Sequence, residues 1–152
     1  MQLTQYTDYS LRVLIYLSLK KPDELGTITD ISEFYGISRN HLVKVVHNLA
    51  TYGFIVTLRG KYGGMRLARP ASDISIGEVV RLTEPNFDIA ECFNKETNSC
   101  VITPMCSLKN ILGQARTQFI HELDRYSIAD ALNNKKNTLY KQIHMKLPAI
   151  HR

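Results

Sequence analysis

Two neighbouring stretches decide the fold: ISRNHLVKVVHNL (residues 37–49) and RGKYGGMRL (residues 59–67). The first stretch places apolar residues at i, i+3, i+4 and i+7 from Leu42 to Leu49, the spacing of an amphipathic helix. Ser38 stands just before this helix, where a side-chain oxygen can accept a hydrogen bond from the first helical turn. We therefore expect a helix from Arg39 to about residue 52.

A shorter helix is expected to begin near Thr29 and to stop at Gly36, a residue typical of helix ends. Two helices joined by so tight a turn form a helix-turn-helix, and its second helix is the one offered to the DNA major groove. The outward face of that second helix carries groups suited to phosphates and base edges. The predicted DNA contacts there are Ser38, Arg39, Asn40, His41 and Lys44.

The second stretch predicts a β-hairpin directly after the recognition helix, with strands over residues 54–58 and 65–67. Its glycine-rich tip lets the backbone approach another surface, and its basic side chains suit a sugar-phosphate backbone or a minor groove. A structural hairpin with incidental charge is the alternative interpretation. The predicted wing contacts are Arg59, Gly60, Lys61, Gly63, Gly64 and Arg66.

The remaining segments predict three further helices. A central apolar helix over residues 8–19 is capped by Thr7, and an S-x-x-E capping box opens a helix over residues 75–83. Thr103 opens a long helix to about residue 125, with Cys106 in its first turn. About 20 residues at about 1.5 Å each span about 30 Å, so we expect part of its apolar stripe to pair with its copy in a symmetric dimer. Packing back onto its own domain is the alternative.

The expected fold is mainly α with a small β-hairpin wing, a winged helix-turn-helix joined to a long dimerisation helix. Residues 1–83 form the DNA-binding domain, and residues 84–104 form a cysteine-bearing loop. Residues 105–132 hold the dimerisation helix and a short following helix, and residues 133–152 form a basic tail.

The charge is strongly partitioned along the 152 residues, which carry a net charge of +5. Residues 34–69 hold six basic side chains and no acid, which favours a polyanion as partner. A merely solvated basic face is the alternative. No apolar run approaches the length of a membrane span, and the apolar stretch over residues 11–19 lacks the flanks of a signal peptide. We therefore expect a cytoplasmic protein.

Three cysteines, Cys92, Cys100 and Cys106, fall within fifteen residues and are the only ones in the chain. An odd number argues against a disulfide framework and favours metal ligation or redox chemistry. Iron-sulfur clusters and structural zinc normally need four ligands, so a fourth must come from elsewhere. The candidates are Asp8, His121, Glu91, Glu96 or a small molecule, and these residues alone do not rank them.

Two other interpretations of the cysteines stay open from the residues alone. The loop could act as a metal-free thiol sensor in the same DNA-binding fold. Alternatively, Cys106 could be the nucleophile of an enzyme, since a helix N-terminus favours its thiolate. The sequence lacks a P-loop, a zinc-protease motif and a recognisable Cys/His/acid constellation, which disfavours the enzyme.

Four stretches carry a resemblance: MQLTQYTDYSLR (1–12), ISRNHLVK (37–44), RGKYGGMRL (59–67) and CVITPMC (100–106). Together they resemble the winged-helix iron-sulfur regulators, the family that includes the nitric-oxide-sensing NsrR repressors and IscR. The resemblance runs through about residue 132. IscR-like members carry a histidine three residues after the last cysteine, where this chain has Lys109, so the NsrR type is favoured.

This resemblance implies a homodimer with one cluster per subunit on Cys92, Cys100 and Cys106, most simply 4Fe–4S, with 2Fe–2S as the alternative. It implies that Asp8 completes the cluster of the other subunit. Seven residues separate Cys92 from Cys100, where some members have five. The implied function is repression at a two-fold symmetric operator, with expression of nitrosative-stress genes when nitric oxide destroys or remodels the cluster. The alternative is a winged-helix regulator that responds to thiol redox state or iron–sulfur status without nitric oxide specificity.

Overall fold

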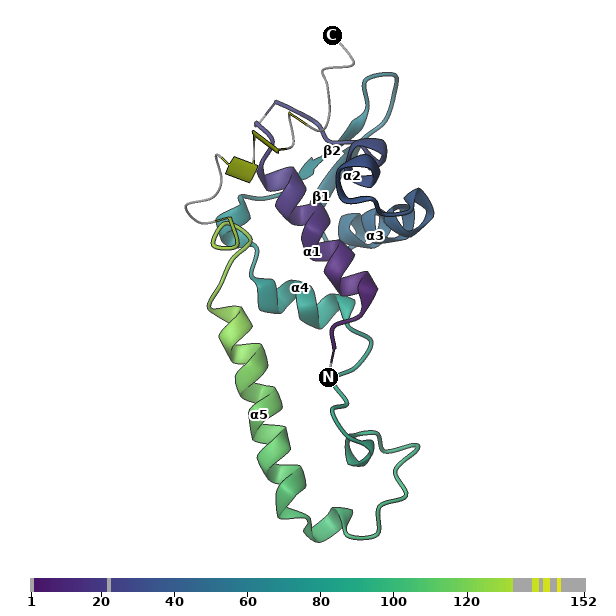
Figure 1. Cartoon of the computed structure of the whole chain (residues 1–152), viewed down its shortest axis with the longest axis vertical. Helices are drawn as coiled ribbons and strands as arrows, with labels where there is room; N and C mark the ends of the chain where they lie inside the picture. Colours follow the sequence, from purple (N-terminus) through teal and green to yellow (C-terminus); the bar gives the residue numbers. More distant parts are fainter. Residues whose placement is uncertain (1, 22, 133–137, 140, 143–144, 146–152) are drawn as a thin grey trace.

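The domain core is built around one apolar helix, α1 (Gln5–Ser18), which packs against α3, α4 and β2 (Figure 1). Its inward side chains, Val13, Leu14 and Tyr16, are fully buried. The predicted central helix is confirmed, but the predicted cap, Thr7, is wrong: the cap lies three residues earlier. Thr4 is the cap and accepts a hydrogen bond from the Thr7 N–H at 3.3 Å.

This computed structural model describes residues 2–21, 23–132, 138–139, 141–142 and 145. Most of the basic tail expected over residues 133–152 therefore lies outside the described residues. Among the residues that the structure describes, no helix has the length and apolar character needed to cross a bilayer.

The predicted helix-turn-helix is present as α2 (Ile28–Tyr35) and α3 (Arg39–Thr51). Gly36 ends α2 with a φ of 68°, a left-handed conformation in which glycine has no Cβ to clash. Helix α2 begins at Ile28, one residue before the expected start near Thr29. Thr27 caps it through a reciprocal capping box with Asp30, which satisfies two backbone N–H groups.

The wing is an antiparallel pair of strands, β1 (Ile55–Leu58) and β2 (Gly64–Leu67), in which Ile55 faces Leu67 and Leu58 faces Gly64. Only one side of this pair enters the core, through Ile55 and Met65. Met65 also exchanges two backbone hydrogen bonds with Gly26, at 2.8 and 2.9 Å, which fixes β2 to the segment before α2. The wing is thus anchored through β2.

A 3₁₀ turn, η1 (Ala71–Asp73), leads into α4 (Ile76–Thr83), which packs against α1. Ser75 caps α4 by accepting from the Glu78 N–H at 3.4 Å, which is one half of the predicted capping box. The Glu78 carboxylate does not complete the box but pairs with Arg69, just after the wing, at 2.6 and 2.7 Å.

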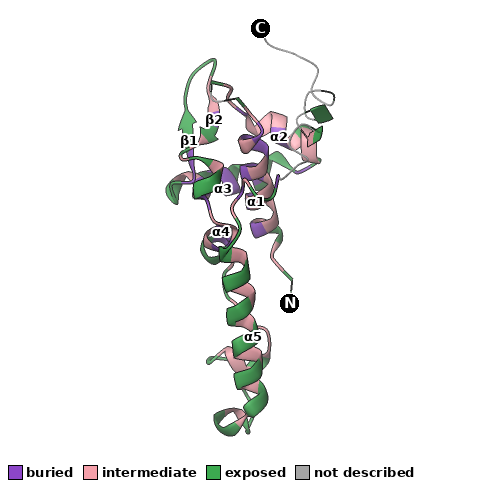
Figure 2. Ribbon diagram, turned by 90° about the vertical axis from the view of Figure 1, so that its left-hand side faces the viewer, coloured by how far each residue is buried: buried purple, intermediate pink, exposed green. Residues whose placement is uncertain are grey.

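The long helix α5 (Ser107–Asp124) begins far from the winged-helix domain and runs back toward it (Figures 1 and 2). Its C-terminal end is attached to α4 by the Arg81–Asp124 ion pair, with a shortest contact of 2.6 Å. The chain then returns to the domain, where Ile128 is fully buried and donates its N–H to the Ile74 carbonyl at 2.9 Å. Hydrogen-bonded turns stand here in place of the short helix expected after residue 125.

Candidate nucleic-acid interface and cysteine loop

The structure places the five predicted contacts of the recognition helix on one solvent-facing surface. Their side chains are all exposed, whereas the opposite face of α3 is buried from Leu42 to Leu49. Ser38 is the N-cap by position, but its side chain makes no capping hydrogen bond. The exposed set, all within the first two turns, is Ser38, Arg39, Asn40, His41 and Lys44.

Helix α1 supports the N-terminal end of the recognition helix through aromatic contacts. The Tyr9 ring stacks on the His41 ring with centroids 6.0 Å apart. One turn later, the Arg12 guanidinium lies 5.7 Å from the ring centroid of Tyr35, at the end of α2. The sequence analysis missed Tyr9, because no local spacing connects it with a residue 32 positions away.

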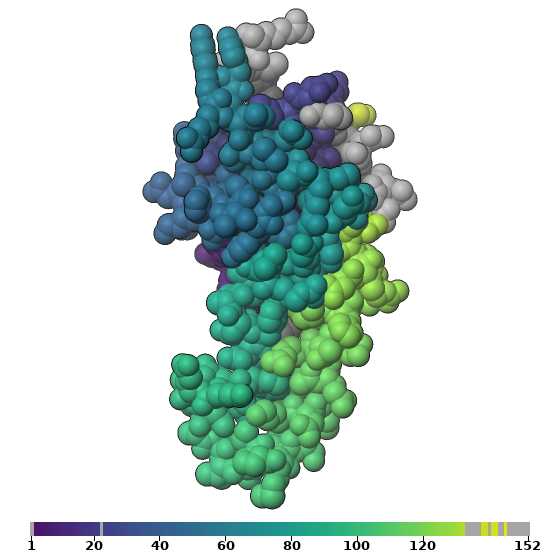
Figure 3. All heavy atoms as spheres, turned by 180° about the vertical axis from the view of Figure 1, so that it is seen from behind, coloured from purple at the N-terminus to yellow at the C-terminus, as the bar shows by residue number. Residues whose placement is uncertain are grey.

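The wing carries its basic side chains outward, with Arg59, Lys61 and Arg66 all exposed. A tight turn forms the tip, in which the Gly63 N–H donates to the Gly60 carbonyl at 2.9 Å. A Cβ at Gly63 would collide with the Leu58 carbonyl, so this position needs glycine. Figures 2 and 3 show the wing projecting on the same side of the molecule as α3.

Within the described part of the chain, almost no acidic side chains pair with the basic surface formed by α3 and the wing. Of the six basic residues between positions 34 and 69, only Arg69 forms an ion pair with an acidic residue that the structure describes. Unpaired cations on one face give a positive field that attracts a polyanion. The geometry thus supports contact with two adjacent parts of a DNA duplex.

The cysteine loop connects α4 to α5 and contains two 3₁₀ turns, η2 (Glu91–Phe93) and η3 (Thr103–Met105). Glu91 accepts two hydrogen bonds from Ser99, from its N–H at 2.6 Å and its hydroxyl at 2.7 Å. These hydrogen bonds lower the pKa of Glu91. Because Glu91 precedes Cys92 and Ser99 precedes Cys100, this contact draws the two cysteine positions toward each other.

The third cysteine is connected to the second by backbone hydrogen bonds. The Thr103 N–H donates to the Cys100 carbonyl at 3.2 Å, and the turn η3 then leads to Cys106. The prediction that α5 begins at Thr103 is wrong, because Cys106 has an extended backbone that separates η3 from α5. Cys106 is the N-cap, and its Sγ accepts from the Lys109 N–H at 3.4 Å.

The donor set fits an iron-sulfur cluster in chemistry, since three free thiols stand on one loop and Cys106 faces the N-terminus of a helix. Within the described residues, no three His, Cys, Asp or Glu side chains come close enough to hold a metal ion. The ligand assignment therefore stays a prediction.

Three of the four candidate side chains for the fourth ligand are engaged by another residue or lie at the far end of α5. The Asp8 carboxylate forms an ion pair with Arg12 at 2.9 Å, and that of Glu91 is held by Ser99. His121 lies in the last turn of α5, at the opposite end of the helix from Cys106.

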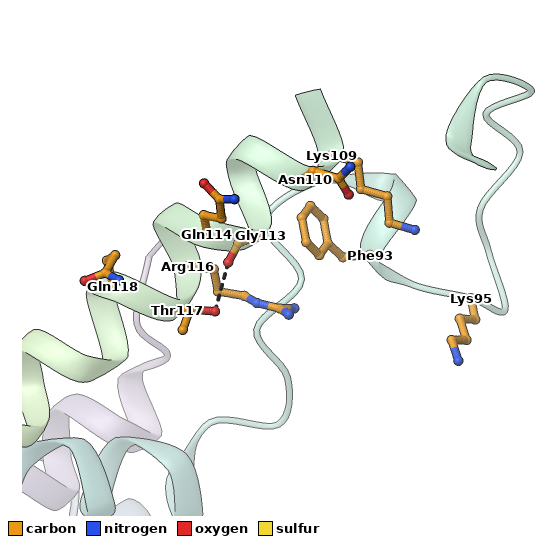
Figure 4. A pocket seen from close by; sticks show the side chains of 9 residues that line it. All are labelled: Phe93, Lys95, Lys109, Asn110, Gly113, Gln114, Arg116, Thr117 and Gln118. Atoms are coloured by element: carbon orange, nitrogen blue, oxygen red, sulfur yellow. Dashed lines mark hydrogen bonds between the residues drawn. The ribbon is translucent and has the colours of Figure 1, made fainter. Parts of the chain in front are cut away.

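An open cavity of about 700 Å³ lies between the cysteine loop and α5 (Figure 4). Its lining includes Phe93 from the loop and Arg116 from α5, whose guanidinium lies 4.9 Å from the Phe93 ring centroid. This cation–π contact attaches the loop to the middle of α5.

An exposed apolar strip runs from the end of the loop along α5, and no residue of α5 is buried in the single chain. Val101 is 90% exposed, Met105 is 86% exposed, and both Leu108 and Ile111 are 61% exposed. Contiguous apolar surface of this kind marks an interaction site.

A helix-turn-helix followed by a basic wing, with a cysteine loop and a long helix attached, defines a winged-helix DNA-binding regulator. Residues 3–134 match the Rrf2 family of iron-dependent transcriptional regulators, and the chain belongs to this family. The resemblance predicted from the four sequence stretches is thereby confirmed.

Among the most similar relatives is the HTH-type transcriptional regulator NsrR of Bacillus subtilis (strain 168), 49% identical over 146 residues, which cover 96% of this chain and 99% of that protein. The NsrR regulator of Halalkalibacterium halodurans is 47% identical over 135 residues, or 89% of this chain and 92% of that protein. The chain is thus a DNA-binding transcriptional regulator, and the enzyme with Cys106 as nucleophile is set aside.

Two solved structures share the fold at lower identity. CymR (YrzC), the global cysteine regulator of B. subtilis, aligns with a TM-score of 0.71 at 21% identity, covering 86% of this chain and 95% of that one. T. potens IscR aligns with a TM-score of 0.71 at 21% identity, covering 91% and 90% of the two chains. These likenesses confirm the winged-helix architecture.

Proposed function

We propose that the protein is a homodimeric repressor that senses nitric oxide through an iron-sulfur cluster. The observation that carries this proposal is the arrangement of three free thiols on one hydrogen-bonded loop at the N-terminus of α5. The high identity to the NsrR relatives and the family description as iron-dependent support it. When bound, the cluster, 4Fe–4S or 2Fe–2S, would supply iron that can react with nitric oxide.

In this proposal each of the three parts of the chain has its own role. Residues 1–83 read the operator in the cytoplasm, residues 84–104 hold the cluster with Cys106, and residues 105–132 form the dimer. The unpaired basic surface on α3 and the wing supports the first assignment. A two-fold dimer then presents two such surfaces to half-sites about one helical turn apart.

Dimerisation through α5 is supported by the exposed apolar strip. A single helix without a buried residue is unusual in a folded protein, because an apolar face gains stability only when it is covered. A second copy of α5 offers the same apolar face, so a symmetric pair covers both strips at once.

The fourth ligand is assigned to Asp8 of the partner subunit, as the resemblance implies. In this chain Asp8 lies in the first turn of α1, one residue before Tyr9, whose ring stacks on His41 of the recognition helix. A carboxylate is a hard ligand that iron would hold weakly, so Asp8 would be the most easily displaced of the proposed ligands. Without the cluster, nothing would hold Asp8 to the cysteine loop of the partner subunit.

The test is an ultraviolet–visible spectrum of protein purified without oxygen, with iron and sulfide assays and stepwise addition of nitric oxide. We expect visible absorbance that bleaches in step with loss of operator binding. Replacing Cys106 by Ser serves as the matched control, because it removes one thiolate and should give protein with little iron. Colourless wild-type protein that binds DNA tightly after failed reconstitution would contradict the proposal.

A thiol-responsive regulator is the second candidate, favoured by the exposure of Cys100. In that case reversible oxidation of iron-free protein should change its DNA affinity, and Ellman's reagent should count the reacting thiols. A cluster sensor predicts instead that iron-free protein binds weakly in both thiol states.

A further inference from the structure

The most prominent side chain of the wing is Tyr62, which is 86% exposed at the tip of the hairpin. It stands between Gly60, with a φ of 118°, and Gly63, whose N–H closes the turn. A tyrosine that buries so little surface in the folded chain contributes almost nothing to core packing. Its place on the tip is therefore open to a role in binding.

The surroundings of Tyr62 favour a nucleic acid as its partner. The Lys61 ammonium lies 5.7 Å from the ring centroid, and Arg59 precedes the turn with an exposed side chain. The ring thus stands within a cluster of cations that the phosphates of a duplex attract. The tip itself is thin, because three of the six residues from Arg59 to Gly64 are glycines.

Shape and chemistry together select the minor groove. That groove is about 6 Å wide and is too narrow for a helix. The glycine-rich turn of the wing is thin, and the Tyr62 ring can enter the groove edge-on. Its walls are apolar deoxyribose, and its floor offers hydrogen-bond acceptors at A·T pairs. A tyrosine supplies both a flat apolar ring and a hydroxyl donor.

We infer that Tyr62 is a minor-groove contact that makes the wing prefer A·T over G·C pairs. The ring packs between the sugars, and the hydroxyl donates to adenine N3 or thymine O2. At a G·C pair the exocyclic amino group of guanine rises from the groove floor into the space that the ring needs. This inference rests on the proposed placement of the wing on DNA.

The experiment uses the full chain, purified without oxygen, and a duplex that the protein itself selects from a random-sequence library. Minor-groove footprinting with hydroxyl radicals first locates the base pairs under the wing. These pairs are then changed to G·C or to inosine·C, which match in the major groove and differ only by the amino group in the minor groove. Affinities are measured for the wild type, Tyr62→Ala, Tyr62→Phe and Lys61→Ala.

The wild type should bind the inosine·C duplex about tenfold more tightly than the G·C duplex, the difference expected for one well-formed contact. Tyr62→Ala should bind the two duplexes equally. Tyr62→Phe should lose part of the preference, because it lacks the hydroxyl. Neither variant should change the salt dependence, because tyrosine is uncharged. Lys61→Ala should keep the preference and lower the salt slope by about 1.

Two outcomes overturn the inference and are distinguishable. If Tyr62→Ala keeps the wild-type preference while Lys61→Ala lowers the salt slope, the wing lies on DNA but Tyr62 does not read it. If Lys61→Ala also leaves the slope unchanged, the proposed placement of the wing fails as well. Unchanged thermal unfolding of the variants shows that each effect comes from the interface.

Discussion

Replacing Ile111 by Ala tests whether α5 forms the dimer. Ile111 is 61% exposed in the single chain, so a partner helix can still cover most of its side chain. Full burial of an isoleucine is worth about 1.5–3 kcal/mol, and the exposed share corresponds to about 1–2 kcal/mol. A two-fold interface buries both copies, so the variant should lose about 2–4 kcal/mol of dimer stability. The dimer Kd then rises between about 30-fold and about 900-fold.

Sedimentation equilibrium across a dilution series measures this Kd, and circular dichroism checks that helix content is kept at high concentration. Val56→Ala is the matched control, since Val56 is 39% exposed on the wing and far from α5 in the fold. The control should dimerise like the wild type. An Ile111→Ala dimer as tight as the control, or a wild type that stays monomeric at all concentrations, would refute the reasoning.

Three further changes test other parts of the molecule. Lys44→Ala should lower the slope of log affinity against log salt by about 1 on every duplex, as measured by fluorescence anisotropy. An unchanged slope would show that Lys44 does not contact a phosphate. Ile128→Ala should lower the free energy of unfolding by about 2–5 kcal/mol, because Ile128 is fully buried, as measured by urea unfolding at fixed protein concentration. A loss below about 1 kcal/mol would mean that the segment after α5 does not pack on the domain. Hydrogen bonds from Ser99 lower the pKa of Glu91 below its ordinary 4.5. Their contribution to folding stability is therefore present above that pH and is lost as the pH falls through the folded pKa. The Ser99 amide shift in NMR should titrate with a midpoint below pH 4.5 and should not titrate in Glu91→Gln, whereas a midpoint at or above 4.5 contradicts the contact.

The winged helix-turn-helix was predictable from the sequence because its signals are local. The apolar period from Leu42 to Leu49, the glycine that ends α2 and the basic hairpin each depend on neighbouring residues only. The cap of α1 was not predictable in the same way. Thr4 and Thr7 are equivalent by local sequence, but the Thr4 N–H donates to Glu84 at 2.7 Å, a contact between residues 80 positions apart. Tertiary packing therefore selects the earlier threonine.

The start of α5 shows a different limit of sequence reasoning. Thr103 followed by proline resembles a helix start, and these residues do form a turn, η3. The sulfur of Cys106 then takes the cap position three residues later, although cysteine is a weak acceptor and carries no usual capping signal. The contact between Glu91 and Ser99 was also missed, because loop hydrogen bonds follow no period.

Helix α1 is the element through which the proposed cluster would act on DNA. Its first turns carry Asp8 and Tyr9 on successive positions, and Tyr9 stacks on His41 at the start of α3. A ligand bond to Asp8 thus acts one residue from a contact that positions the recognition helix. The Asp8 carboxylate also neutralises Arg12 in the single chain, at 2.9 Å. The proposed ligation therefore exchanges an ion pair inside one subunit for a bond between subunits. Such a bond would couple the placement of the two DNA-binding domains to the state of the cysteine loop.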